Sequence, residues 1–67
     1  MSETISLLSL RDVCALTSLS RTSINREREA GRFPAAVPLG DRRVAFVREE
    51  VLSWIKSRIA IRDKAAA

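Results

Sequence analysis

Apolar residues recur every three or four positions in a short stretch near the start of the chain. This spacing predicts an amphipathic helix of about two turns over residues 10–16. The Ser9 hydroxyl is placed to cap it, and Asp12 at the third helical position completes a short form of the capping box. Thr17 and Ser18 are expected to end the helix.

The same start signal returns at Ser20, which is flanked by Leu19 and Ile24 at the positions of a hydrophobic staple. A second helix is therefore expected over residues 21–30, and Gly31 closes it in the left-handed conformation. Two short helices joined by residues 17–20 have the sequence form of a helix-turn-helix.

Beyond Gly31 the periodicity changes. Short apolar runs at residues 37–39 and 43–46 face each other across the turn residues 40–42, which predicts a β-hairpin. Pro38 has no N–H to donate to a ladder, so it should lie on an edge strand or at a position that makes no ladder hydrogen bond.

The helical spacing then resumes over residues 49–61 and predicts a third and longest helix, whereas residues 63–67 are expected to fray. Phe33, Phe46 and Trp54 are interpreted as core anchors rather than base-stacking residues. The expected fold is mainly α with a small β-hairpin, a winged helix-turn-helix in the order helix-helix-hairpin-helix. We expect one domain over residues 1–67, ordered from about residue 7 to 62.

Composition argues against several classes of protein. Twelve Lys and Arg outnumber eight Asp and Glu, for a net charge of +4, as expected of a protein that meets a polyanion. Histidine is absent and Cys14 is the only cysteine, so we expect no enzyme, no metal site, no cofactor and no disulfide. No apolar stretch approaches the length of a membrane helix. A reducing, cytoplasmic location follows as an expectation.

The second predicted helix carries the candidate DNA-reading residues. If Ile24 points inward, a rotation of about 100° per residue places Thr22 and Arg26 on nearly the opposite side, with Ser23 and Asn25 on the flanks. These are side-chain types that read base edges, and the leading end of such a helix enters the major groove. A plain solvated helix surface is the competing interpretation, since Glu27 and Glu29 would repel phosphate.

The distribution of arginines favours DNA over that alternative. From residue 21 to 43 the chain carries six arginines, no lysine and three acids. Arg42 and Arg43 at the hairpin turn are expected to contact the DNA backbone or minor groove, and Arg28 and Arg32 are candidate phosphate clamps. Arg28 lies only about 40° from Ile24, so its stem is also expected to cover the edge of the core. The candidate DNA-binding residues are Arg21, Thr22, Ser23, Asn25, Arg26, Arg28, Arg32, Arg42 and Arg43.

Several of these runs together resemble the AlpA family of phage regulators. They are the segments at residues 19–24 and 31–34, Leu39-Gly40 with Arg42, and Val51 with Trp54-Ile55. The resemblance covers about residues 9 to 56. It implies a MerR-like, excisionase-related winged helix and a prophage-encoded transcriptional regulator in the cytoplasm of a bacterial host. It also assigns recognition to Arg21, Thr22, Ser23, Asn25 and Arg26, and the wing to residues 37–46.

Three functions remain open at this point. The protein is expected to bind double-stranded DNA as a transcriptional regulator, or as an excisionase that bends DNA for an integrase. The third alternative is a protein-interaction module that does not bind DNA. An integrase, RNA polymerase or further copies of the chain on DNA are the candidate protein partners.

Overall fold

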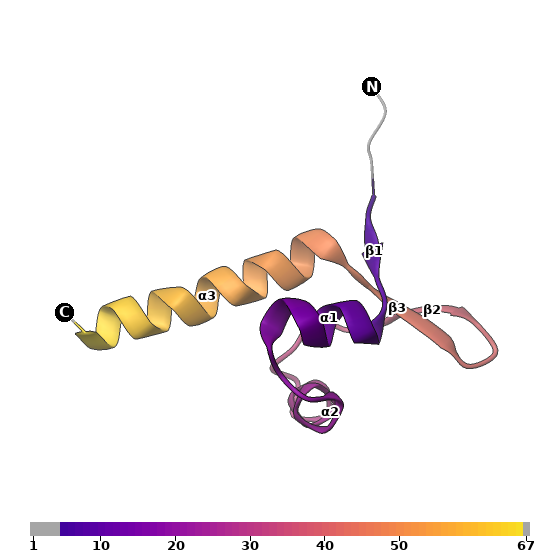
Figure 1. Cartoon of the computed structure of the whole chain (residues 1–67), viewed down its shortest axis with the longest axis horizontal. Coiled ribbons are helices and arrows are strands. Elements are labelled where there is room, and N and C mark those ends of the chain that lie inside the picture. The colour runs from indigo at the N-terminus through magenta and orange to yellow at the C-terminus, as the bar shows by residue number, and fades with distance from the viewer. Residues whose placement is uncertain (1–4, 67) are drawn as a thin grey trace.

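The computed structural model of the chain describes residues 5–66. Residues 1–4 and 67 of the expected domain lie outside this range. The elements in chain order are β1 (Leu7–Leu8), α1 (Leu10–Thr17), α2 (Arg21–Glu29), β2 (Val37–Gly40), β3 (Arg43–Val47) and α3 (Arg48–Ala66) (Figure 1). This order confirms the winged helix-turn-helix prediction, with the β2–β3 hairpin as the wing.

Serine hydroxyls start the two short helices as predicted. Ser9 Oγ accepts a hydrogen bond from the Asp12 backbone N at 3.0 Å, and the Ser9 N–H donates to the Asp12 carboxylate at 3.2 Å. At α2, Ser20 Oγ accepts from the Ser23 backbone N at 3.1 Å. Each cap satisfies backbone donors that a helix leaves unpaired at its N-terminus.

The turn between α1 and α2 differs slightly from the prediction. Thr17 does not break α1 but is its last residue, and Ser18 follows in the left-handed conformation with φ of 61°. The Thr17 hydroxyl donates to the Val13 carbonyl at 2.8 Å and accepts from the Leu19 N–H at 3.3 Å. The side chain that was expected to end the helix therefore completes it and orders the turn.

Gly31 has the predicted left-handed conformation, with φ of 75°. Helix α2 ends at Glu29, one residue before the expected end, because Ala30 forms the C-cap. The Gly31 N–H donates to the Arg28 carbonyl at 3.1 Å, and the Arg32 N–H donates to the Glu27 carbonyl at 2.9 Å. These bonds satisfy carbonyls that the helix leaves unpaired and turn the chain toward Phe33.

A Gly31→Ala substitution should lower the free energy of unfolding by about 1 kcal/mol, because a Cβ is unfavourable at this positive φ. No heavy atom lies within 4 Å of the added Cβ, so the loss is purely conformational. Urea unfolding followed by circular dichroism measures it. Gly40→Ala is the control, since Gly40 has equally open surroundings but lacks a positive φ. Equal losses in the two variants would contradict this explanation.

The sheet has the strand order β1-β3-β2 and is antiparallel throughout. Pro38 lies on the edge strand β2, opposite Val44, as its missing N–H requires. Strand β1 was not predicted, because two residues are too few to show an alternating pattern. It pairs Leu7 with Val47 and Leu8 with Phe46. This pairing places the start of the described chain next to the start of α3.

The core forms where α1, α2, β3 and α3 meet. Its buried members are Val13, Ile24, Phe33, Phe46 and Val51. The Phe33 ring meets Phe46 edge to face at a centroid distance of 5.7 Å, and meets Trp54 at 4.8 Å. Trp54 is half-buried, and its indole N–H donates to the Arg32 carbonyl at 2.7 Å. The three aromatic residues are thus core anchors, as predicted, with Trp54 at the margin.

Helix α3 is longer than predicted at both ends. It begins at Arg48, directly after β3, and continues to Ala66 rather than ending near Ile61. Residues 62–66 are Arg, Asp, Lys, Ala and Ala, which include strong helix formers and no breaker. Residues 63–66, which were expected to fray, are helical in the structure, and Ala67 is outside the described range. The C-terminal half of α3 projects away from the rest of the fold (Figure 1).

None of the helices within residues 5–66 is both long enough and apolar enough to cross a membrane.

Candidate nucleic-acid interface

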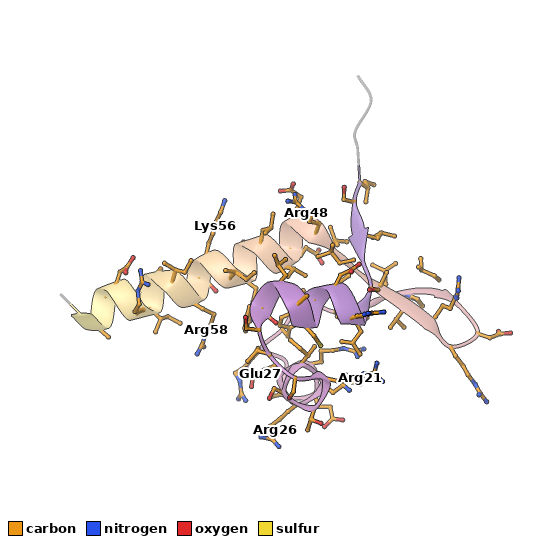
Figure 2. The ribbon with its side chains drawn as sticks, viewed as in Figure 1. Arg21, Arg26, Glu27, Arg48, Lys56 and Arg58 are labelled. Carbon is orange, nitrogen blue, oxygen red and sulfur yellow. The ribbon has the colours of Figure 1, made fainter. Side chains whose placement is uncertain are left out.

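Helix α2 presents a polar outer face because its inner face is fixed by one buried residue. Ile24 is 0% exposed, as the sequence pattern predicts, whereas Thr22, Arg26 and Glu29 are exposed on the opposite side. Arg26 projects away from the helix and from the core (Figure 2). Ser23 and Asn25 are half-buried on the two flanks. The outer face of α2, defined by Thr22, Arg26 and Glu29, is therefore open to a ligand.

One flank of this face is continuous with the wing. Arg21, at the start of α2, lines a concavity of about 610 Å³ together with Arg42 and Arg43 from the hairpin. Leu39, Val44 and Ala45 form part of its wall, as does Ser9 at the start of α1. We call this the wing-side concavity. It brings Arg21 together with Arg42 and Arg43, two exposed arginines that follow it by 21 and 22 residues in the sequence.

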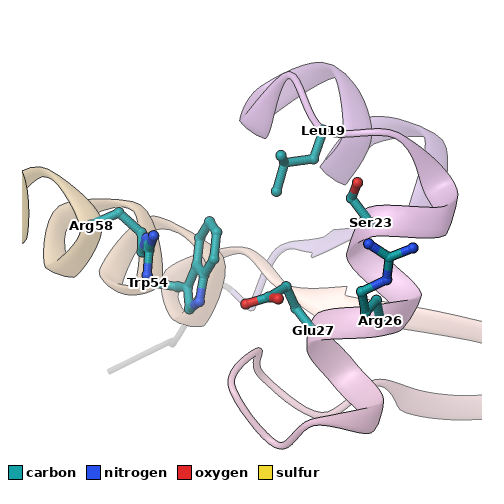
Figure 3. A pocket seen from close by; sticks show the side chains of 6 residues that line it. All are labelled: Leu19, Ser23, Arg26, Glu27, Trp54 and Arg58. Atoms are coloured by element: carbon teal, nitrogen blue, oxygen red, sulfur yellow. The ribbon is translucent and has the colours of Figure 1, made fainter.

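The other flank of α2 faces α3 across a cleft of about 300 Å³ (Figure 3). The residues that line it are Leu19, Ser23, Arg26, Glu27, Trp54 and Arg58. The two hollows lie on opposite flanks of the outer face, because Arg21 faces the wing while Ser23 and Glu27 face α3. We call the second one the α3-side cleft.

An ion pair neutralises the acidic group of the α3-side cleft. Arg32 donates from Nε to Glu27 Oε1 at 3.1 Å and from Nη2 to Oε2 at 3.0 Å. This hydrogen bonding lowers the pKa of Glu27, and the positive charges of Arg58 and Arg26 lower it further. The same contact raises the pKa of Arg32. Glu27 is thus ionised at neutral pH, but its charge is compensated.

Both predicted phosphate clamps, Arg28 and Arg32, are engaged within the protein. Arg28 Nη1 donates to Asn25 Oδ1 at 3.0 Å, and its guanidinium lies 5.3 Å from the centre of the Phe46 ring. Arg28 therefore covers the edge of the core, as its angular position indicated. Arg32 is held by Glu27. By contrast, Arg21, Arg26, Arg42 and Arg43 are exposed and have no ion pair among the described residues.

Arg58 is the residue of this surface that was not among the sequence candidates. The available signal was its spacing of four residues from Trp54, which places both side chains on one face of α3. Its guanidinium lies 5.9 Å from the centre of the Trp54 ring. Its place opposite α2 depends on tertiary packing, which no local pattern encodes.

Comparison with known families adds an independent observation. Residues 6–59 match the family model of the prophage CP4-57 regulatory protein AlpA. The chain belongs to the AlpA family. The matched range contains α1, α2, the sheet and α3 as far as Ile59. It thus includes both hollows that flank α2.

A relative in Enterobacteria phage P4 agrees with this assignment. The chain is 39% identical over 57 residues to its protein ORF88, which is itself uncharacterized. The aligned stretch is 85% of this chain and 65% of that relative, so the chain spans about two thirds of the relative's length. AlpA is a family of regulatory proteins rather than of enzymes.

Proposed function

We propose that this AlpA-family protein binds double-stranded DNA sequence-specifically and acts as a transcriptional regulator of a phage or prophage. The observation that carries the proposal is the orientation of α2. Ile24 anchors one side of the helix in the core, so that Thr22 and Arg26 project outward beside an arginine-lined wing. Membership of a regulatory family supports the same function.

An exposed helix face of this kind is suited to a major groove. That groove is about 12 Å wide in B-form DNA and admits one α-helix, whose leading residues then face the base edges. With α2 in the groove, Arg21 and the wing arginines face the adjacent backbone. Contacts of this kind fix position and supply most of the salt-dependent affinity, whereas base contacts supply specificity.

Arg26 is the main candidate for reading a base. It is exposed on the outer face, and a guanidinium can donate two parallel hydrogen bonds to O6 and N7 of guanine. Thr22 and Ser23 lie one turn earlier and carry hydroxyls that can contact a base or a phosphate. Asn25 already uses its side-chain oxygen to accept from Arg28, so its amide N–H groups are the part left for DNA.

The proposal is tested by selecting binding sites from a pool of random duplexes and measuring affinities by fluorescence anisotropy. We expect a defined site to be enriched. Arg26→Ala should weaken binding to that site by about 1–3 kcal/mol and relax the preference at one base pair. The affinity of this variant for random duplex DNA should fall less, because only one positive charge is lost, and this loss should depend on the salt concentration.

The control for Arg26→Ala is Lys56→Ala, which removes one positive charge from the side of α3 that faces away from α2 (Figure 2). Failure to enrich any sequence, or an Arg26→Ala variant with unchanged base preference, would contradict the proposed role of α2. The competing function, a protein-interaction module, predicts weak binding to DNA that salt does not affect.

A further inference from the structure

The two sides of α2 offer unequal numbers of positive groups to DNA. A helix in the major groove has a sugar-phosphate strand on each side of it. On the wing side, Arg21, Arg42 and Arg43 are available for one strand. On the other side the nearest surface is the α3-side cleft, whose carboxylate Glu27 would repel the second strand if it were uncompensated.

The α3-side cleft is nevertheless positive. The bidentate contact with Arg32 compensates Glu27, which leaves the charges of Arg26 and Arg58 in excess. Arg58 is exposed and rests its guanidinium against the half-buried Trp54 ring. Figure 3 shows the Arg58 side chain beside the Trp54 ring, at the α3 wall of the cleft.

The cleft also contains a hydroxyl donor. Ser23 Oγ accepts a hydrogen bond from Ser20 Oγ at 3.0 Å. Because Ser23 accepts in that pair, its own hydroxyl proton can be donated to a ligand. A guanidinium and a hydroxyl on opposite walls of an open cleft are the donors that a phosphate oxygen accepts from in protein–DNA contacts.

We propose that the α3-side cleft binds a backbone phosphate of the DNA strand opposite the wing, with Arg58 as its principal ligand and Ser23 as a second donor. This inference rests on the proposed DNA-binding function and extends the contact surface to α3. Arg26 lies at the rim of the cleft and remains directed toward the bases. The protein then contacts both of the DNA strands that border the major groove.

The test compares Arg58→Gln with Lys56→Gln, two exposed α3 substitutions that each remove one positive charge. Figure 2 shows the two side chains projecting from opposite sides of the helix. Anisotropy is measured over a range of salt concentrations on a random duplex and on the selected site. Arg58→Gln should reduce the slope of log affinity against log salt by about 0.9, and weaken both duplexes about fivefold at 0.15 M salt. Lys56→Gln should change the slope by much less.

A positional measurement complements the affinities. Ethylation of individual phosphates should interfere with the wild-type protein at one position on the strand opposite the wing, and that interference should disappear with Arg58→Gln. Arg58→Lys keeps the charge and should keep most of the salt slope. Thermal unfolding midpoints should agree among all variants, because Arg58 and Lys56 are both exposed.

The outcomes separate this inference from the function on which it rests. Equal slopes for Arg58→Gln and Lys56→Gln, with steep salt dependence in the wild type, would overturn the cleft assignment alone. Such equal slopes would be expected if the cleft bound an acidic protein segment instead of DNA. Absence of salt-dependent DNA binding by the wild type would overturn the proposed function as well.

Discussion

Replacing Arg21, Arg42 and Arg43 together by Gln should lower the affinity for random duplex DNA on the order of 100-fold at 0.15 M salt. These three side chains line the wing-side concavity and are free of ion pairs with other described residues. If each contacts one phosphate, the slope of log affinity against log salt should fall by about 2.7, because each contact contributes about 0.9. Anisotropy titrations at several salt concentrations measure both quantities.

The matched control for the wing-side variant replaces Arg48, Lys56 and Lys64 by Gln. All three are exposed residues of α3, and Arg48 and Lys56 project from the side away from α2 (Figure 2). This variant has the same net charge as the wing-side variant. Similar losses in both would mean that DNA responds only to the total charge of the protein, and the assignment of the wing-side concavity would be wrong.

Phe46→Ala should lower the free energy of unfolding by about 3–5 kcal/mol. Phe46 is 0% exposed and lies at the centre of the core, in contact with the Phe33 ring and beneath the Arg28 guanidinium. Removing its ring leaves a cavity that its neighbours can fill only in part. A chain of this size has a small core, so the loss is a large share of its total stability.

Urea unfolding followed by the circular dichroism of the helices measures this loss. Leu39→Ala is the control, because Leu39 is in the adjacent strand β2 and is 55% exposed. It should change stability by less than about 0.5 kcal/mol. A Phe46→Ala protein that is as stable as the Leu39→Ala protein would show that the ring does not organise the core.

The parts of the fold that sequence could predict are those encoded by neighbouring residues. Ser9 and Ser20 cap helices through the backbone three residues later, and Gly31 adopts the conformation that glycine favours. The position of Ile24 within one helical repeat fixes which side chains face outward. Each signal depends on contacts within about one helical turn, so it can be recognised in a linear pattern.

The parts that could not be predicted depend on contacts between distant segments. Strand β1 exists because Leu7 and Leu8 pair with β3, forty residues later, and their own sequence has too few positions to show a strand period. Arg58 lines the cleft only because the tertiary fold places α3 across from α2. Similarly, helix α3 extends beyond its core contacts, so hydrophobic spacing gives no indication of where it ends.

Sequence alone also does not show which arginines of the interface are available to bind DNA. From the sequence, Arg21 and Arg26 are the first candidates for DNA contacts, and Arg28 and Arg32 follow as candidate phosphate clamps, with Arg28 also expected to cover the edge of the core. In the structure Arg28 lies against Phe46, and Arg32 compensates Glu27. Charge counting therefore overstates the number of groups available to DNA. The proposed contacts are instead the exposed arginines of α2 and the wing, together with Arg58.

The most direct test of the central claim is an NMR titration of isotopically labelled protein with the selected duplex. The claim is that the outer face of α2 and the wing together bind DNA. We expect the largest amide shift changes at residues 21–26 and 40–43, with little change at residues 59–65. Changes confined to the C-terminal half of α3, with α2 and the hairpin unaffected, would contradict the claim.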